Sequence, residues 1–172
     1  MKNTLFFFLL MLGFEAFTQQ QATDSLGSFY SFGYKIVWKA YFNMADVTKQ
    51  VIYEKLEETN GIVILNTTNP NLIRAKIDNV IMAQSRLLLA DNKAYISGMA
   101  RITISSSGYS VEVSDMTMTA ENRFTSTNPN DKNYAYSFES LYLKNRSGTF
   151  NNIKPERMKP MDDFFEKLFM VE

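Results

Sequence analysis

Acidic side chains are the first residues of this sequence to assess for chemistry, because it contains neither histidine nor cysteine. Without these two residue types, Ser-His-Asp triads, thiol nucleophiles and mixed nitrogen and sulfur zinc sites cannot form. Two carboxylates alone can hydrolyse a glycosidic bond, one as an acid and the other as a nucleophile or base. The acids to assess are Asp115, the neighbours Asp162 and Asp163, and the neighbours Glu57 and Glu58.

Each of these acids also has a structural explanation, and that explanation is favoured. Asp115 interrupts an alternating run where an apolar residue is expected, which indicates either a functional acid or a β-bulge. Asp162 and Asp163 are expected in the first turn of a helix, where the helix dipole favours acids. Glu57 and Glu58 are expected at a solvated helix end. We therefore predict no catalytic residue, no metal site and no cofactor. The alternative is a secreted hydrolase that uses carboxylates.

A cluster of aromatic residues is the second candidate site. Tyr134, Tyr136, Phe138 and Tyr142 could bind a glycan, an apolar ligand or a partner protein, because tyrosine is wide, stiff and amphipathic. The favoured alternative is that these side chains cover the open side of a sheet. A strand would place Tyr134, Tyr136 and Phe138 on one face. A helix would instead align Phe138, Leu141 and Tyr142.

Composition limits the class of partner. The chain has 172 residues and 45% apolar residues, which is enough for one domain with a core. Lysine and arginine total 18, as do aspartate and glutamate, so the formal net charge is zero. This balance does not provide the basic field that nucleic acid binding normally needs. We expect an envelope protein, a glycan or an apolar ligand as the partner.

The N-terminal residues are typical of a secretory signal peptide. Lys2 precedes an apolar run from Leu5 to Phe14, and small residues follow. The run is shorter than the about 20 residues that cross a bilayer. We expect residues 1–18 to be a signal peptide, 19–28 a flexible lead-in and 29–172 a single exported domain. A lipid-modified cysteine is excluded, and no later run reaches bilayer length.

An alternating pattern around a serine turn predicts a β-hairpin over residues 98–118. In the favoured register Ile102 faces Val111 on one side of the hairpin, and Arg101 faces Glu112 on the other. Cross-strand pairs of these kinds contribute roughly 0.2–1 kcal/mol each. A shift by one residue would mix the apolar and polar faces, so this register is preferred.

The same register explains Asp115. Gly98 would face Asp115 on the apolar side, and beyond this point the two faces exchange. One extra residue near Asp115 would return Met116 and Met118 to the core side, as a β-bulge does. Glycine is a natural residue opposite such a kink.

The other expected elements come from periodicity and turn residues. Asn43 is expected to cap the main helix, and Asn60 and Gly61 to end it. The elements are a half-buried strand over 34–42, this helix over 43–60, a second hairpin over 61–81, a loop over 121–133, irregular chain over 144–160 and a short amphipathic helix over 161–172. Residues 82–93 fit either a wide connection or a short helical turn.

This order of elements resembles a family of secreted bacterial domains of unknown function with a TATA-binding-protein-like fold. The resemblance lies in "KAYFNMADVTKQVIYEKLEE", "LIRAKI", the pair "YISGMARITIS" and "YSVEVSDMTM", and the tail "FESLYLK…FFEKLF". The segment "RLLLADNKA" departs from it. The family has no assigned catalytic residues, so none is transferred to this chain. The fold name implies no DNA binding, because fold does not determine function.

These observations predict an α+β domain. A twisted antiparallel sheet of about five strands would pack one face on the helix over 43–60, with the C-terminal helix beside it. The expected function is that of an exported, soluble, non-enzymatic binding module.

Overall fold

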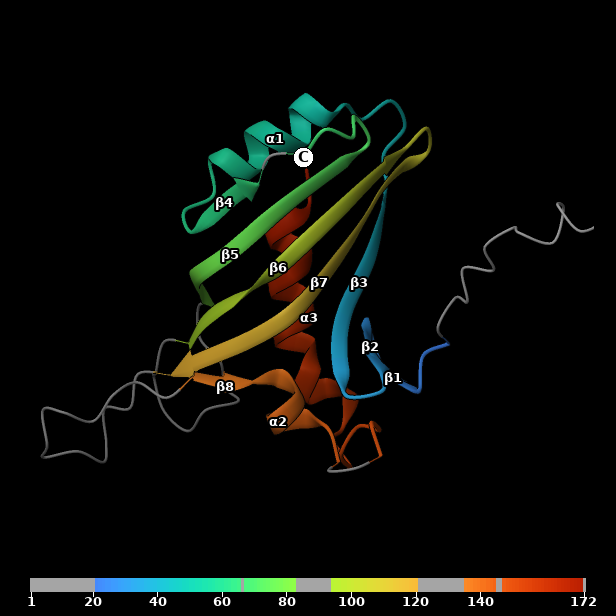
Figure 1. Cartoon of the computed structure of the whole chain (residues 1–172), viewed down its shortest axis with the longest axis vertical. Helices are drawn as coiled ribbons and strands as arrows, with labels where there is room; N and C mark the ends of the chain where they lie inside the picture. Colours follow the sequence, from blue (N-terminus) through green and yellow to red (C-terminus); the bar gives the residue numbers. More distant parts are fainter. Residues whose placement is uncertain (1–20, 66, 83–93, 121–134, 145–146, 172) are drawn as a thin grey trace, which may run out of the picture.

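The computed structural model describes residues 21–65, 67–82, 94–120, 135–144 and 147–171. An eight-stranded antiparallel sheet dominates this part of the chain (Figure 1), with strand order β1-β2-β3-β7-β6-β5-β4 and with β8 paired to β7. The strands are Asp24–Leu26 (β1), Phe29–Phe32 (β2), Lys35–Asn43 (β3), Ile62–Leu65 (β4), Leu72–Met82 (β5), Ala94–Ser105 (β6), Gly108–Ala120 (β7) and Ala135–Ser137 (β8). The helices of this part are Lys49–Glu57 (α1), Phe138–Tyr142 (α2) and Pro155–Phe169 (α3).

Helix α3 lies behind the sheet in Figure 1 and covers the middle of one face. Aromatic rings fill the space between them. The ring centroid of Trp38 in β3 lies 5.2 Å from that of Phe165 and 6.2 Å from that of Phe169. Phe29 of β2 lies 6.4 Å from Phe165. Because burying such large apolar surfaces is the dominant favourable term in folding, the core lies on this face.

The predicted α+β class with a large antiparallel sheet is confirmed, but the prediction of about five strands is wrong, because the sheet has eight. The additional strands have three or four residues each: β1 and β2 were not predicted, and β8 was predicted only as an alternative to a helix. Runs this short show too little alternation to be recognised. Strand β1 lies within residues 19–28, where a flexible lead-in was expected, and Asp24 pairs there with Ser31 of β2.

Strands β6 and β7 form the predicted hairpin in the predicted register. Ile102 pairs with Val111 on the core side, and Arg101 pairs with Glu112 on the other side. The pairing continues to the turn, where Ser105 faces Gly108. The register is therefore fixed by the match between the two alternating runs, as the sequence indicated.

The predicted bulge at Asp115 is also present. Strand β7 has one more residue than β6 opposite Gly98, and Asp115 takes a left-handed backbone conformation with φ 51°. After it, Met116 and Met118 return to the buried side. A second bulge, which was not predicted, lies on the other side of Gly98, where β5 gains a residue and Asn79 has φ 53°. Both bulges increase the local twist of the sheet.

Helix α1 is shorter than the helix predicted over 43–60. It begins after Thr48, whose hydroxyl accepts a hydrogen bond from the backbone N–H of Val51 at 3.4 Å. Asn43, the predicted cap, is instead the last residue of β3 and pairs with Gly108 of β7. The prediction was wrong at this end because sheet pairing extends the strand past the first residue with capping character.

Helix α3 is the main helix against the sheet, and it begins earlier than the short helix predicted over 161–172. Pro155 starts it at the first helical position, where a missing N–H costs nothing. Pro160 lies inside the helix, although proline normally ends one, and this signal misled the prediction. Asp162 and Asp163 consequently lie in the middle of α3 and not in its first turn.

The segment that contains the aromatic candidates, for which the sequence fits either a strand or a helix, contains one of each. Residues Ala135–Ser137 form β8, and α2 follows directly. The hydroxyl of Ser137 accepts a hydrogen bond from the N–H of Ser140 at 3.1 Å, which caps the helix at its first turn.

Candidate functional site: the open face of the sheet

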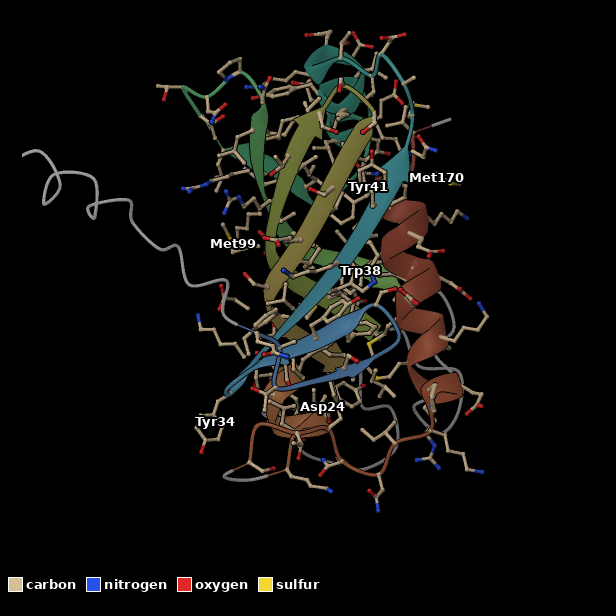
Figure 2. All side chains as sticks on the ribbon, turned by 90° about the vertical axis from the view of Figure 1, so that its right-hand side faces the viewer. Asp24, Tyr34, Trp38, Tyr41, Met99 and Met170 are labelled. Carbon is tan, nitrogen blue, oxygen red and sulfur yellow. The ribbon has the colours of Figure 1, made fainter. Side chains whose placement is uncertain are left out.

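We call the face of the sheet turned away from α3 the open face. Within the described part of the chain, no helix covers it. Figure 2 places Trp38 between the sheet and α3, and Met99 on the opposite side. Along β6 the side chains alternate, so that buried Ala100 is followed by exposed Arg101. Antiparallel sheets commonly leave one face to solvent in this way, and the residues on that face are free to serve function.

A row of charged residues crosses the open face at its centre. Arg74 of β5 pairs with Arg101 of β6, Arg101 pairs with Glu112 of β7, and Glu112 pairs with Lys39 of β3. The Lys39 ammonium forms an ion pair with the Glu112 carboxylate at 2.8 Å. Both side chains are partly exposed, and such pairs contribute about 1 kcal/mol or less.

The two arginines of this row face each other directly. Like charges at directly opposed cross-strand positions are destabilising. Among the described residues, the ion pairs involve neither Arg74 nor Arg101. The centre of the open face therefore carries two exposed guanidinium groups, and neither forms an ion pair with a carboxylate of the described residues.

A groove lies beside this row, between β2 and the central strands. Its volume is about 970 Å³, and its lining includes Tyr30, Phe32, Val37, Lys39 and Arg101. A smaller hollow of about 350 Å³ continues past Arg101. The two hollows are lined by four cationic and two acidic side chains, which are Lys35, Lys39, Arg74 and Arg101 against Glu112 and Asp115. This surface is positive, although the whole chain has a net charge of zero.

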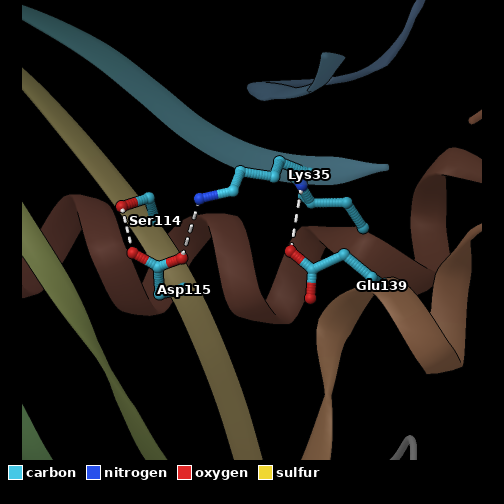
Figure 3. A network of polar contacts seen from close by, with 5 residues as sticks. Lys35, Ser114, Asp115 and Glu139 are labelled. Atoms are coloured by element: carbon cyan, nitrogen blue, oxygen red, sulfur yellow. Dashed lines mark hydrogen bonds and ion pairs between the residues drawn. The ribbon is translucent and has the colours of Figure 1, made fainter. Parts of the chain in front are cut away.

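Asp115 lies where the sheet forks. Strand β7 pairs with β3 before the bulge and with β8 after it. Figure 3 shows the contacts across the fork: the Asp115 carboxylate contacts the Lys35 ammonium at 3.4 Å and accepts a hydrogen bond from the Ser114 hydroxyl at 3.1 Å. Glu139 of α2 accepts a hydrogen bond from the backbone N–H of Ile36 at 3.1 Å. Asp115 is exposed, and its backbone explains its presence without catalysis.

The aromatic candidates are not brought together on one surface. Tyr134 lies outside the described residues. Phe138 is fully buried and Tyr142 almost so, with their ring centroids 5.5 Å apart, and Phe138 also stacks on Phe29. A buried ring offers no face to a ligand. Tyr136 alone among the described candidates is exposed.

The acids of α3 and α1 have structural contacts. Asp162 accepts a hydrogen bond from the Trp38 indole N–H at 2.7 Å and another from the Ser28 hydroxyl at 3.1 Å. Asp163 forms an ion pair with Lys159 at 2.7 Å, which raises the pKa of that lysine through the hydrogen bond. Glu57 ends α1 and is exposed, as predicted.

Asp162 therefore connects α3 to the β1–β2 end of the sheet. No group of acids arranged to hold a metal ion occurs among the described residues.

Two buried tyrosines have raised pKa values. Burial raises the pKa of Tyr109, and the hydrogen bond from the Val171 backbone N–H opposes this effect in part. The Tyr109 hydroxyl also donates to the backbone carbonyl of Phe169 at 2.8 Å. Burial alone raises the pKa of Tyr142. The Tyr109 hydroxyl thus holds the C-terminal segment, and neither tyrosine lines the hollows described above.

The residues that make the open face distinctive were not predicted from the sequence. Tyr30 and Phe32 belong to β2, a strand that was not predicted. The opposition of Arg74 and Arg101 depends on the register between β5 and β6, which no short turn fixes. The alternation of side chains alone does not predict this register, because a slip by two residues keeps every side chain on its own face.

Together, the long antiparallel sheet, the helix across one face and the bare opposite face define the class as α+β, which is what the resemblance to a TATA-binding-protein-like (TBP-like) fold implies. The chain is similar to a DUF4468 family protein from Bacteroides ovatus, with a TM-score of 0.51 and 15% identity over 85% of this chain and 88% of that one. It is also similar to a TBP-like protein from Parabacteroides distasonis, with a TM-score of 0.47 and 16% identity over 79% and 91% of the two chains.

No protein-family model matches the chain, and neither does any curated protein. The resemblance inferred from the sequence is thus confirmed at the level of the fold. Within the described residues, no helix is both long enough and apolar enough to span a bilayer.

Proposed function

We propose that this chain is an exported, non-enzymatic binding module and that the open face of its sheet is the binding surface. The observation that carries the proposal is the groove of about 970 Å³ on a sheet face without a helix. Its lining combines aromatic Tyr30 and Phe32, apolar Val37 and the ends of basic side chains. Ligand sites are concave and combine apolar surface with polar groups that fix orientation, and this groove offers both, since Lys35, Lys39, Arg101 and Glu112 also line it.

A hydrolase is not favoured by any observation on this face. Glu112 and Asp115 are the acids that line the two hollows, and each carboxylate contacts a lysine, Lys39 and Lys35 respectively. Glycoside hydrolysis needs a pair of carboxylates that face one glycosidic bond, whereas each of these two carboxylates is engaged by a lysine of its own.

A thermal-shift screen tests the binding surface. Neutral oligosaccharides, fatty acids and peptides are the probes, and a ligand of the open face should raise the melting temperature. Val37→Glu, in the groove, should abolish that rise because it places a charge among the apolar contacts. Val51→Glu, on the exposed side of α1, is the matched control and should preserve it. A ligand that stabilises Val37→Glu as strongly as the wild type would refute this location.

Export is the second part of the proposal, and it rests on residues 1–18 as a signal peptide. We expect the mature chain to lack about 18 residues, in keeping with the charged, apolar and small-residue order of a signal peptide. Intact-mass measurement of the exported fraction checks this loss. Leu9→Arg combined with Leu10→Arg interrupts the apolar run and should retain the full-length chain inside the cell. Exported protein that still begins at Met1 would refute the proposal.

A further inference from the structure

We propose that the open face binds an extended acidic segment of a partner protein, with Arg74 and Arg101 as the residues that recognise its carboxylates. This inference rests on the proposed function, because it names the ligand class of the same surface. It starts from the two guanidinium groups that face each other across β5 and β6 without an acidic neighbour in an ion pair.

The geometry of the pair suits two carboxylates. A guanidinium group presents its N–H donors in a planar fork that matches a carboxylate, so each arginine can bind one acid through two hydrogen bonds. Directly opposed side chains on neighbouring strands have Cβ atoms about 5 Å apart. Acidic residues at alternate positions of an extended peptide lie about 6.6 Å apart on the same side. The flexible arginine side chains can span the small difference.

The surroundings favour a peptide over an acidic polysaccharide. Sugars bind by stacking on an open aromatic ring, but the Lys39 ammonium lies 4.9 Å from the centre of the Phe32 ring and occupies its face. The Tyr30 ring is half-buried. Arginine, tyrosine, phenylalanine and methionine are enriched in protein interfaces, and the hollows present all four, including Met99.

Glu112 adds selectivity along the row. It lies between Arg101 and Lys39, so a third acid placed directly over it would be repelled. Its carboxylate is held by Lys39 at 2.8 Å and leaves Arg101 for the ligand. The peptide that fits best therefore has acids at two alternate positions and a neutral or basic residue at the next alternate position, which would lie over Glu112.

Fluorescence anisotropy with a labelled peptide tests the proposal. The probe is an extended peptide of about ten residues, a length of roughly 33 Å, with glutamates at two alternate positions among leucine, tyrosine and serine. A matched probe carries glutamine at both positions. We expect the glutamate probe to bind the full chain more tightly by roughly tenfold or more, and to weaken as salt rises, because the carboxylates are the recognised groups.

Variants locate the site. The double variant R74Q/R101Q should weaken binding of the glutamate probe by roughly tenfold or more and remove the preference over glutamine. The matched control K154Q/R157Q removes two exposed cations near the start of α3 and should leave binding unchanged. Both arginines are exposed, so thermal melts should show that R74Q/R101Q remains folded.

The outcomes separate this inference from the proposed function. Equal affinity for the two probes, or unchanged binding by R74Q/R101Q, would overturn the role of the arginines. Binding of polygalacturonate through Arg74 and Arg101, with neither peptide bound, would overturn the peptide and leave the open face as a binding surface. Stabilisation by a neutral ligand that is lost in Val37→Glu, with neither peptide bound, would likewise support the proposed function while opposing this inference.

Discussion

On the face of the sheet that α3 covers, neighbouring strands present apolar side chains to one another, whereas at the same level of the open face they present charges. Val111 pairs with Ile102 on the covered side. At the adjacent position of each strand, on the open face, Glu112 pairs with Arg101, and Arg101 pairs with Arg74. The backbone register is the same for both faces, so stability can select it through the covered face alone. The open face is then free to carry an arrangement that costs stability.

The comparison assigns different roles to the two faces. Removing a side chain from the covered face should lower the free energy of unfolding, because it opens a cavity in a close-packed core. Removing one from the open face should change stability little and binding much. Substitutions on the two faces should therefore differ in what they change.

Trp38→Ala should give the largest loss, about 3–5 kcal/mol in the free energy of unfolding. It removes the ring that contacts Phe165 and Phe169 and leaves Asp162 without its indole donor. Urea denaturation followed by circular dichroism measures the effect. Val37→Ala, the adjacent open-face position of β3, is the control and should cost clearly less. Equal losses would show that the two faces do not differ as we describe.

Asp162→Ala should cost about 1–3 kcal/mol, because it leaves the Trp38 indole N–H without an acceptor in a partly buried position. Asp163→Ala is a matched control one residue along α3, since Asp163 is exposed and contacts only Lys159 among the described residues. The fluorescence maximum of Trp38, the single tryptophan, gives a second measurement of the lost contact. If Asp163→Ala were the more destabilising change, Asp162 would not connect α3 to the sheet.

Tyr109→Phe should cost about 1–2 kcal/mol near neutral pH, because its hydroxyl makes two hydrogen bonds to the C-terminal segment. Burial raises the pKa of Tyr109 above 10.0, so the folded state favours the neutral form. That contribution is complete below about pH 10 and is lost as the pH rises through the folded pKa. The variant should therefore lose less stability than the wild type above this pH. Identical alkaline slopes in urea melts would contradict the assignment.

Asp115→Val should cost about 1–2 kcal/mol, because a β-branched residue tolerates a left-handed backbone poorly. Asp115→Gly should change stability little, since glycine adopts this conformation readily and the lost ion pair with Lys35 is exposed. Thermal melts of the two variants separate the stability effect of the left-handed backbone conformation from that of the lost carboxylate. Equal losses would mean that the carboxylate and not the bulge explains Asp115.

The sequence predicted the parts of the molecule in which long alternating runs are joined by a short turn. The register of β6 and β7 and the bulge at Asp115 followed from the alternation of side chains, because a slip by one residue would expose a whole apolar face. Strands of three or four residues and the start of α3 did not follow. Their signals are short, and Pro160 indicates a break that the packing of α3 overrides.

The candidate site was harder to predict for a physical reason. The sequence of residues 82–93, between the strands of Arg74 and Arg101, fits either a wide connection or a short helical turn, so it predicts no register between the two arginines. The aromatic candidates were chosen by residue type, but Phe138 and Tyr142 are drawn into the core by their own apolar area. Charges on an exposed face have no such driving force, and only the register brings them together.

Arg74→Glu gives the smallest and most selective test of the comparison, because we expect it to stabilise the protein. It replaces a like-charge pair with an opposite-charge pair across β5 and β6, a change of roughly 0.2–1 kcal/mol. Lys76→Glu, two residues along the same strand, should lower stability slightly, since Lys76 faces Met99 and pairs with Asp78 at 3.3 Å. Urea melts at low and high salt measure both changes, and the gain should shrink as salt screens it.

The same substitution should remove binding of the glutamate probe. A variant that is more stable but does not bind would show that the arginine pair is kept at a cost to the fold, as expected where function and stability compete. If Arg74→Glu instead destabilised the protein, Arg74 and Arg101 would have to stabilise the sheet together. The side chains of the open face would then contribute to the stability of the fold, as those of the covered face do.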